Sequence, residues 1–145
     1  MEVNGYRIAP RANLVRAYLG FTDLRNADLR NAKLNGADLE GANLASARLI
    51  GADLTDVNLD DARLSGADLS GAILRGANLT GADLTDANLS NADLSPTGEI
   101  RGTGFGDRAG PGVGRVAAGN TNLTGANLQG ANLAGAIMPD GSIHD

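Results

Sequence analysis

A five-residue internal repeat of the form A-(D/N)-L-x-x dominates this sequence, and it limits the possible folds more than any other feature. Leucine stands at the centre of all seventeen consecutive units between residues 12 and 96, and alanine lies two residues earlier in fifteen of them. Thr22 and Val57 replace the alanine in the other two. Four more units follow at 121–140, centred on Leu123, Leu128, Leu133 and Met138. A period this regular over most of the chain indicates a repeat architecture.

A period of five fits neither of the regular secondary structures. On an α-helix each residue advances by about 100°, so leucines five residues apart would be spread around the helix and would define no face. On a flat strand side chains alternate with a period of two, so successive leucines would point to opposite sides. All leucines can face the same way only if the chain turns between units.

The residues two positions after each leucine indicate where the chain turns. Of the seventeen in the first block, seven are glycine, three asparagine and three aspartate, and these residue types tolerate positive φ and tight turns. If every unit turns the chain through a right angle, four units close a square coil of twenty residues whose Ala and Leu face the axis. We therefore predict an all-β fold, a right-handed quadrilateral parallel β-helix of about five coils, in which neighbouring coils pair as parallel strands.

Two long runs of the sequence, NADLRNAKLNGADLEGANL and GADLSGAILRGANLTGADLTDANLSNADL, resemble the pentapeptide-repeat family nearly unit by unit. This resemblance implies the same right-handed quadrilateral β-helix. The ending AIMPDGSIHD is similar to the C-terminal ends of cyanobacterial members of the family. Such a fold does not by itself define a function.

The phase of the repeat divides a single domain, residues 1–145, into five segments. In order, these are an N-terminal cap (1–11), seventeen repeats (12–96), a Gly-rich loop (97–120), four repeats (121–140) and a tail (141–145). An open first coil would expose its apolar interior, so we expect a cap there. The residues expected to form it are Tyr6, Ile8, Tyr18 and Phe21. The turn-forming residues after Met138 are expected to close the last coil, and with both ends covered we expect a monomer.

Composition excludes several classes of function. The chain has no Cys, one His (His144) and a net charge of −5, which excludes disulfide frameworks, thiolate or paired-His metal sites and a Cys nucleophile, and disfavours a Ser-His-Asp triad. The acidic balance disfavours direct binding of nucleic acid. Neither a signal peptide nor a membrane-spanning apolar run is visible. We therefore expect a cytoplasmic, non-enzymatic protein without cofactor, metal or membrane contact.

The Gly-rich loop is the first candidate site for a partner. Residues 97–120 contain eight glycines and three arginines, whereas the chain as a whole is acidic. Loops on rigid scaffolds often carry binding residues. The alternative is a surface excursion without function, since long insertions cost little entropy. The candidate contact residues in the loop are Arg101, Phe105, Asp107, Arg108 and Arg115.

An acidic cluster on the second side of the predicted coil is the second candidate site. Residues twenty positions apart should stack in neighbouring coils, which brings Glu40 and Asp60 together as like charges. Asp38, Asp56 and Asp61 extend the cluster, and the candidate contact residues in it are Asp38, Glu40, Asp60 and Asp61. It can be interpreted as a solvated surface or as a docking patch for a basic partner. Because the sheet faces are expected to be convex and without a cleft, acid–base catalysis is disfavoured there.

Two functions from different classes follow from these features. The first is a rigid scaffold or protein-interaction module whose partner is another, unidentified protein. The second is implied by the family resemblance, because some pentapeptide-repeat proteins bind type II topoisomerases such as gyrase as DNA mimics and protect them from inhibitors. Here the acidic cluster spans only one or two coils, and arginines such as Arg48, Arg63 and Arg75 interrupt any longer acidic track. The sequence therefore favours the scaffold.

Overall fold

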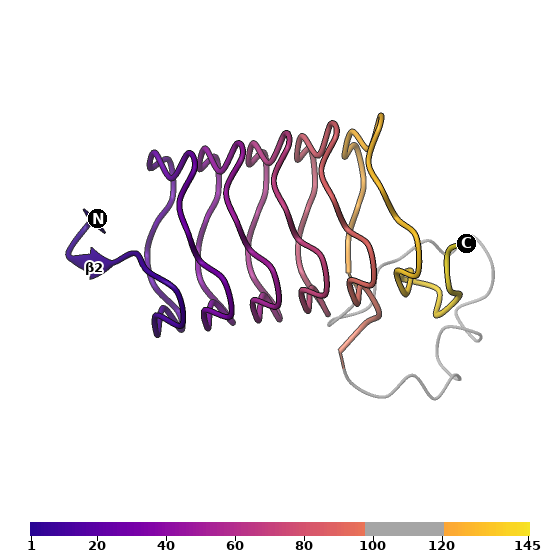
Figure 1. Ribbon diagram of the computed structural model, residues 1–145, viewed down its shortest axis with the longest axis horizontal. Coiled ribbons are helices and arrows are strands. Elements are labelled where there is room, and N and C mark those ends of the chain that lie inside the picture. Colours follow the sequence, from indigo (N-terminus) through magenta and orange to yellow (C-terminus); the bar gives the residue numbers. More distant parts are fainter. Residues whose placement is uncertain (98–120) are drawn as a thin grey trace.

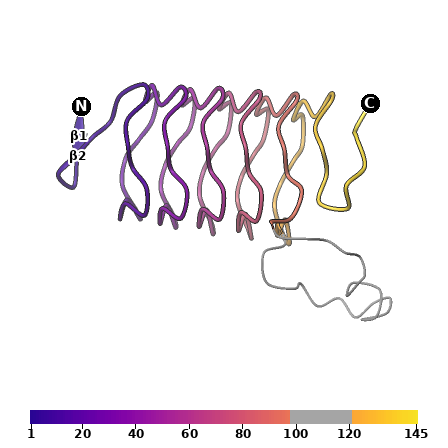
Figure 2. The same ribbon diagram turned by 90° about the horizontal axis from the view of Figure 1, so that it is seen from below.

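The computed structural model is a solenoid whose coils stack along one long axis (Figure 1, Figure 2). The structure describes residues 1–97 and 121–145. The N-terminus lies at one end of the stack and the C-terminus lies at the other (Figure 1). Position in the sequence therefore corresponds to height along the axis.

Two short strands precede the first coil. β1 (Glu2–Val3) and β2 (Tyr6–Arg7) pair antiparallel, with Val3 opposite Tyr6. The turn between them consists of Asn4 and Gly5, whose φ angles are 54° and 84°. Positive φ at both central residues is typical of the type I′ turn that Asn-Gly favours. The chain thus begins with a hairpin at the N-terminal end of the solenoid.

Beyond the hairpin, neighbouring coils pair through isolated parallel bridges. The bridging residue is the one before each leucine, and in residues 13–93 its partner lies twenty residues along the chain. The bridges form four columns, which we name the Asn13, Tyr18, Asp23 and Asp28 sides after their first members. We number the coils from residue 12 in steps of twenty. The predicted parallel strands are thus shortened to single bridging residues, because two of the five residues in each unit form a turn.

The corners of the coil are β-turns formed by the two residues after each leucine. At one corner the N–H of Ala27 donates to the carbonyl of Leu24 at 3.1 Å, and Asn26 between them has a φ of 61°. A type II turn requires positive φ at this third residue. Arg16 and Phe21 also adopt it, with φ of 59° and 56°, although bulky residues seldom do so. The repeating turn therefore determines the backbone conformation of the corners even where the residue type does not favour it.

Alanine and leucine line the interior of the coils, as the sequence predicts. From Leu14 to Leu94 every repeat leucine is at most 2% exposed, and Val57 is buried at an alanine position. Thr22 takes another alanine position and donates its hydroxyl to the carbonyl of Leu19 at 2.6 Å. A buried polar group must be hydrogen-bonded to be tolerated. Charged side chains are consequently confined to the outer sides.

After the interruption the repeat resumes in the expected register. Asn122 pairs with Asn78, and the N–H of Leu79 donates to the carbonyl of Asn122 at 2.8 Å. Leu123 therefore occupies the side that follows Leu94. The last coil thus stacks on coil 4 with the same bridges as in the coils before it.

Thr121 joins the two blocks of repeats. Its side chain takes an inward position and is 6% exposed. Its Oγ1 accepts the N–H of Gly76 at 2.8 Å and lies 3.2 Å from the carbonyl oxygens of both Leu74 and Ser95. At equivalent corners of the complete coils this N–H donates to a backbone carbonyl of the next coil. The Thr121 hydroxyl therefore lies between Gly76 and Ser95, and it accepts the N–H that the carbonyl of Ser95 would accept in a complete coil.

Thr121→Val is expected to lower the free energy of unfolding by about 1–3 kcal/mol, because it leaves the N–H of Gly76 without its acceptor. Thr22→Val is a matched control, since the Thr22 hydroxyl only donates to a carbonyl. Its loss should lower the free energy of unfolding by about 0.5–1.5 kcal/mol. Urea denaturation measures both values, and equal destabilisation would contradict the role assigned to Thr121.

The N-terminal cap differs from the expectation for two of its four residues. Ile8 is 5% exposed and Tyr6 is half-buried, and both pack against the core as predicted. Tyr18 and Phe21 are instead 73% and 76% exposed. Tyr18 stands at a bridging position, which points outward, and the ring of Phe21 lies over Gly41 at a corner. Their position within the repeat unit, and not their apolar character, determines this exposure.

The C-terminal segment closes the last coil on one side only. Ile137 pairs antiparallel with Ile143, and Ala136 next to it is fully buried. The inward leucines of the other three units, Leu123, Leu128 and Leu133, are only partly buried. The expectation of a closed last coil is therefore met at one side. The expectation of a monomer, which assumed two closed ends, loses that support.

Candidate functional site

Aspartate or asparagine precedes most repeat leucines for a local structural reason. Its Oδ1 accepts the N–H of the residue two positions later, as Asp53 does from Thr55 at 3.1 Å. The same oxygen of Asp53 also accepts the Thr55 hydroxyl at 2.6 Å. Side chains of this type commonly hold turns in this way. A functional surface should therefore be sought among outer charges that the fold leaves without an opposite charge.

The four candidate contact residues of the predicted acidic cluster lie together on the Tyr18 side and its next corner. We call Asp38, Glu40, Asp60 and Asp61 the acidic surface. Glu40 and Asp60 take the same position in coils 2 and 3. The Oδ1 atom of Asp38 accepts the N–H of Glu40 and the side-chain amide of Asn58, both at 3.1 Å. Among residues 1–97 and 121–145, no lysine or arginine forms an ion pair with these four. Like charges therefore stack here without an ion pair from the described part of the chain.

The candidate contact residues in the loop lie outside the described residues and stay predictions; they are Arg101, Phe105, Asp107, Arg108 and Arg115. In the described part of the chain, no three His, Cys, Asp or Glu side chains are grouped so that they could hold a metal ion. The same part contains no helix that is long and apolar enough to cross a bilayer. The charges on the outer sides are the candidates that remain.

A basic surface in the first two coils was not predicted from the sequence. Arg11 and Arg16 stand at the two corners that flank Asn13, and Lys33 bridges Asn13 from coil 2. We call Arg11, Arg16 and Lys33 the basic surface. All three side chains are exposed, and no ion pair joins any of them to a carboxylate within the two described ranges.

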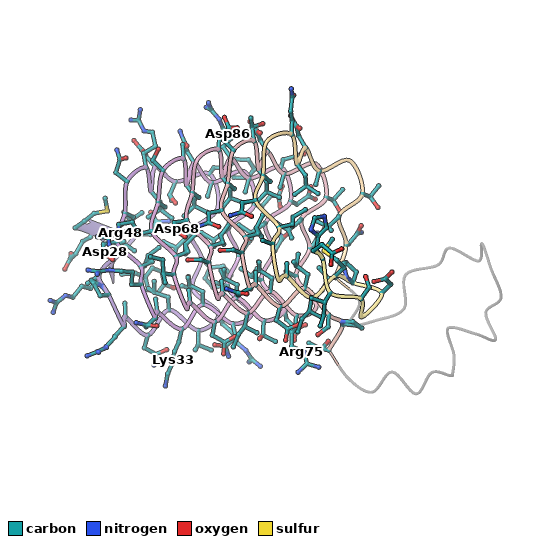
Figure 3. All side chains as sticks on the ribbon, turned by 45° about the vertical axis from the view of Figure 1, so that its right-hand side comes forward. Asp28, Lys33, Arg48, Asp68, Arg75 and Asp86 are labelled. Carbon is teal, nitrogen blue, oxygen red and sulfur yellow. The ribbon has the colours of Figure 1, made fainter. Side chains whose placement is uncertain are left out.

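Two nearby arginines, in contrast, each form an ion pair with an aspartate. Arg25 and Arg30 each follow an aspartate by two residues, and their Nη2 atoms lie 2.7 Å from Asp23 Oδ2 and Asp28 Oδ2 respectively. Asp28 also lies 3.7 Å from Arg48 in the coil above, and Figure 3 shows this row on a different side from Lys33. The cations of the basic surface take other positions in the repeat unit, where this local pairing is absent. The signal in the sequence is the Asp-x-Arg spacing of Asp23–Arg25 and Asp28–Arg30, which Arg11, Arg16 and Lys33 lack.

The paired arginines change the acidity of their aspartates. The side-chain hydrogen bonds from Arg25 are the main reason that the pKa of Asp23 falls from its ordinary value of 3.8 to about 2. The side-chain bonds from Arg30 likewise lower the pKa of Asp28. The fold therefore favours the charged form of both carboxylates.

The stability of the protein is expected to fall as the pH is lowered from about 4 to about 2. A carboxylate whose pKa is lower in the folded than in the unfolded chain stabilises the fold above its unfolded pKa. This contribution is lost as the pH falls through the folded pKa, which is about 2 for Asp23. Thermal melting at several pH values measures the decline, and Asp23→Asn should make it shallower. The same decline in the variant and the natural chain would rule out a contribution from this pair.

The fold and its outer sides define the class of protein, a repeat solenoid with an apolar interior and charged outer sides. The sequence profile of pentapeptide repeats matches residues 12–49, 22–61, 62–95 and 118–140, in eight copies. These matches cover more than half of the chain. The chain therefore belongs to the pentapeptide repeat family, as its sequence predicted. Among curated proteins none matches the sequence.

Solved structures of pentapeptide repeat proteins from plants and cyanobacteria resemble this chain. One from the thylakoid lumen of Arabidopsis thaliana is 27% identical with a TM-score of 0.56, over 88% of this chain and 72% of the other. One from the cyanobacterium Nostoc is 40% identical with a TM-score of 0.43, over 60% and 70%. HetL of Nostoc, which is involved in the regulation of heterocyst differentiation, is 32% identical with a TM-score of 0.35. That match covers 92% of this chain and 65% of HetL, just under two thirds of its length.

Proposed function

We propose that this protein is a right-handed quadrilateral β-helix that acts as a non-enzymatic scaffold and binds another protein through its outer sides. The four columns of bridges support the quadrilateral coil, and right-handed winding is the strong default for parallel crossovers. Apart from the hydrogen-bonded Thr22 and Thr121, the interior of the described coils consists of apolar side chains, which supply no group for acid–base or nucleophilic chemistry. The outer sides are the part of the molecule that a partner can reach.

The acidic surface is the observation that carries this proposal. Glu40 and Asp60 are like charges in consecutive coils, and this arrangement destabilises a sheet. A basic segment laid over them would relieve the repulsion and form charge-assisted hydrogen bonds. A rigid side also loses little conformational freedom on binding. We therefore propose a basic protein segment as the partner at this side. Further proposed contacts in the loop are Arg101, Phe105, Asp107, Arg108 and Arg115.

Binding of a synthetic Lys-rich peptide tests the acidic surface. Glu40→Gln combined with Asp60→Asn removes two charges and should weaken binding about two- to thirtyfold, because each exposed ion pair contributes about 0.2–1 kcal/mol. Glu2→Gln combined with Asp145→Asn removes the same charge at the two ends of the chain and serves as the control. If both double variants lose the same affinity, net charge and not the acidic surface governs binding.

DNA mimicry toward a type II topoisomerase is the alternative function. A DNA mimic must present a long acidic track, since duplex DNA carries one charge per ~1.7 Å of its axis. The acidic surface is limited to coils 2 and 3. We therefore expect the protein to leave gyrase supercoiling unchanged, with or without a quinolone. Protection of gyrase from the quinolone in a supercoiling assay would favour the alternative.

A further inference from the structure

The basic surface is the strongest charge feature that the acidic surface does not explain. Residues 1–36 contain six basic and three acidic residues, whereas residues 37–97 contain three basic and ten acidic ones. Positive charge is therefore concentrated in the first coils of an acidic protein. A positively charged patch on a rigid side of an acidic protein can select a partner of negative charge.

Its three cations differ from the neighbouring arginines because, among the described residues, none of them forms an ion pair. Arg25 and Arg30 are each held by an aspartate two residues earlier. Arg11, Arg16 and Lys33 are exposed, and the described residues supply no ion pair for them. The aliphatic part of Arg16 lies over the Cα of the glycine at the corner above, which fixes the start of this side chain. Their charge is therefore available to a partner.

No carboxylate lies on the Asn13 side in the first two coils. Its outward residues there are Asn13, Val15, Lys33 and Asn35. Val15 is 41% exposed and adds an apolar contact to the cationic ones. The first carboxylate on this side is Asp53 in coil 3, directly above Lys33. The basic surface is thus a patch two coils high, or about 10 Å, with negative charge above it.

We propose that the basic surface docks a short acidic segment of a partner protein, rich in aspartate and glutamate. Its carboxylates would pair with the guanidinium groups of Arg11 and Arg16 and with the ammonium of Lys33. Nucleic acid or an anionic bilayer lying along this side would also meet Asp53 and Asp93 in the higher coils and would be repelled. A short segment avoids that repulsion. The inference rests on the proposed scaffold function and adds a second partner chemistry at a second side.

Fluorescence anisotropy with a synthetic Glu-rich peptide tests this on the full chain. The variant R11Q/R16Q/K33Q should weaken binding by about threefold to about 150-fold, since each exposed ion pair changes a binding constant by about 1.4-fold to about fivefold. The matched control R25Q/R30Q/R48Q removes the same charge from arginines that are already paired, and it should change binding by less than about twofold. Thermal melting verifies that both variants are folded. If R11Q/R16Q/K33Q is not folded, the single variants Arg16→Gln and Lys33→Gln are measured in its place.

Two results would overturn the proposal directly: no binding of the Glu-rich peptide by the natural chain, or equal weakening in both triple variants. Tighter binding of single-stranded DNA or of phosphatidylserine vesicles than of the peptide would overturn it as well. The Lys-rich peptide is measured in the same series. If E40Q/D60N binds the Lys-rich peptide as tightly as the natural chain does, this result counts only against the proposed partner of the acidic surface. The failures of the two proposals are therefore distinguishable.

Discussion

Leu54→Ala is expected to lower the free energy of unfolding by about 2–5 kcal/mol. Leu54 is 1% exposed and lies in the middle of the stack, between Leu34 and Leu74 of the neighbouring coils. Removing its side chain opens a cavity in a close-packed interior. The backbone bridges above and below hold the coils apart, so the walls of the cavity collapse only partly.

The adjacent outward residue provides the control for this prediction. Thr55→Ser retains the hydroxyl that donates to Asp53, and it should change the free energy of unfolding by no more than about 0.5 kcal/mol. Guanidinium denaturation measures both variants. A similar loss at Leu54 and Thr55 would refute the division between an apolar interior and polar outer sides.

Gly81→Ala is expected to destabilise the protein more than Gly71→Ala. Both glycines have positive φ, 68° and 66°, so an alanine costs about 1–2 kcal/mol at either position. At Gly81 the added Cβ would also overlap with Oδ1 of Asp61 in the coil below, whereas nothing lies within 4 Å at Gly71. Because this oxygen is the end of an exposed side chain that can rotate away, its displacement should add about 0.5–1.5 kcal/mol.

Thermal melting of the two glycine variants measures the difference between them. Asp61→Ala in the Gly81→Ala background removes the overlapping oxygen and should recover the additional loss. If it recovers nothing, overlap with Asp61 is not the reason that this corner requires glycine. The cost of positive φ alone would then apply to both corners.

The two charged surfaces occupy neighbouring sides of the solenoid at overlapping heights. The basic surface lies in coils 1 and 2 on the Asn13 side, and the acidic surface lies in coils 2 and 3 on the Tyr18 side. A rigid coil keeps these sides at a constant separation. Such a scaffold is suited to hold two partner segments of opposite charge side by side.

Most of the coil could be predicted from the sequence, because its determinants lie within one repeat unit. The direction of each side chain follows from its place in A-(D/N)-L-x-x, and the turn follows from the residue two positions after leucine. The same periodicity predicted that Leu123 follows Leu94 and that Glu40 stacks beneath Asp60. These features needed no knowledge of contacts between distant segments.

The tertiary structure decided three features that the repeat does not determine. These are the burial of side chains at the N-terminal end, the hydrogen bonds where the repeat is interrupted, and the ion pairing of the outer arginines. The repeat positions of Tyr18 and Phe21 point outward, and only the folded chain shows that the hairpin packs Tyr6 and Ile8 against the core without covering these two rings. Thr121 supplies an acceptor that only the meeting of two separate blocks requires. Within residues 1–97 and 121–145, Arg16 has no ion pair, whereas Arg25 two units later has one. The repeat determines where a side chain points, but its burial or neutralisation depends on which other groups the folded chain brings within contact distance.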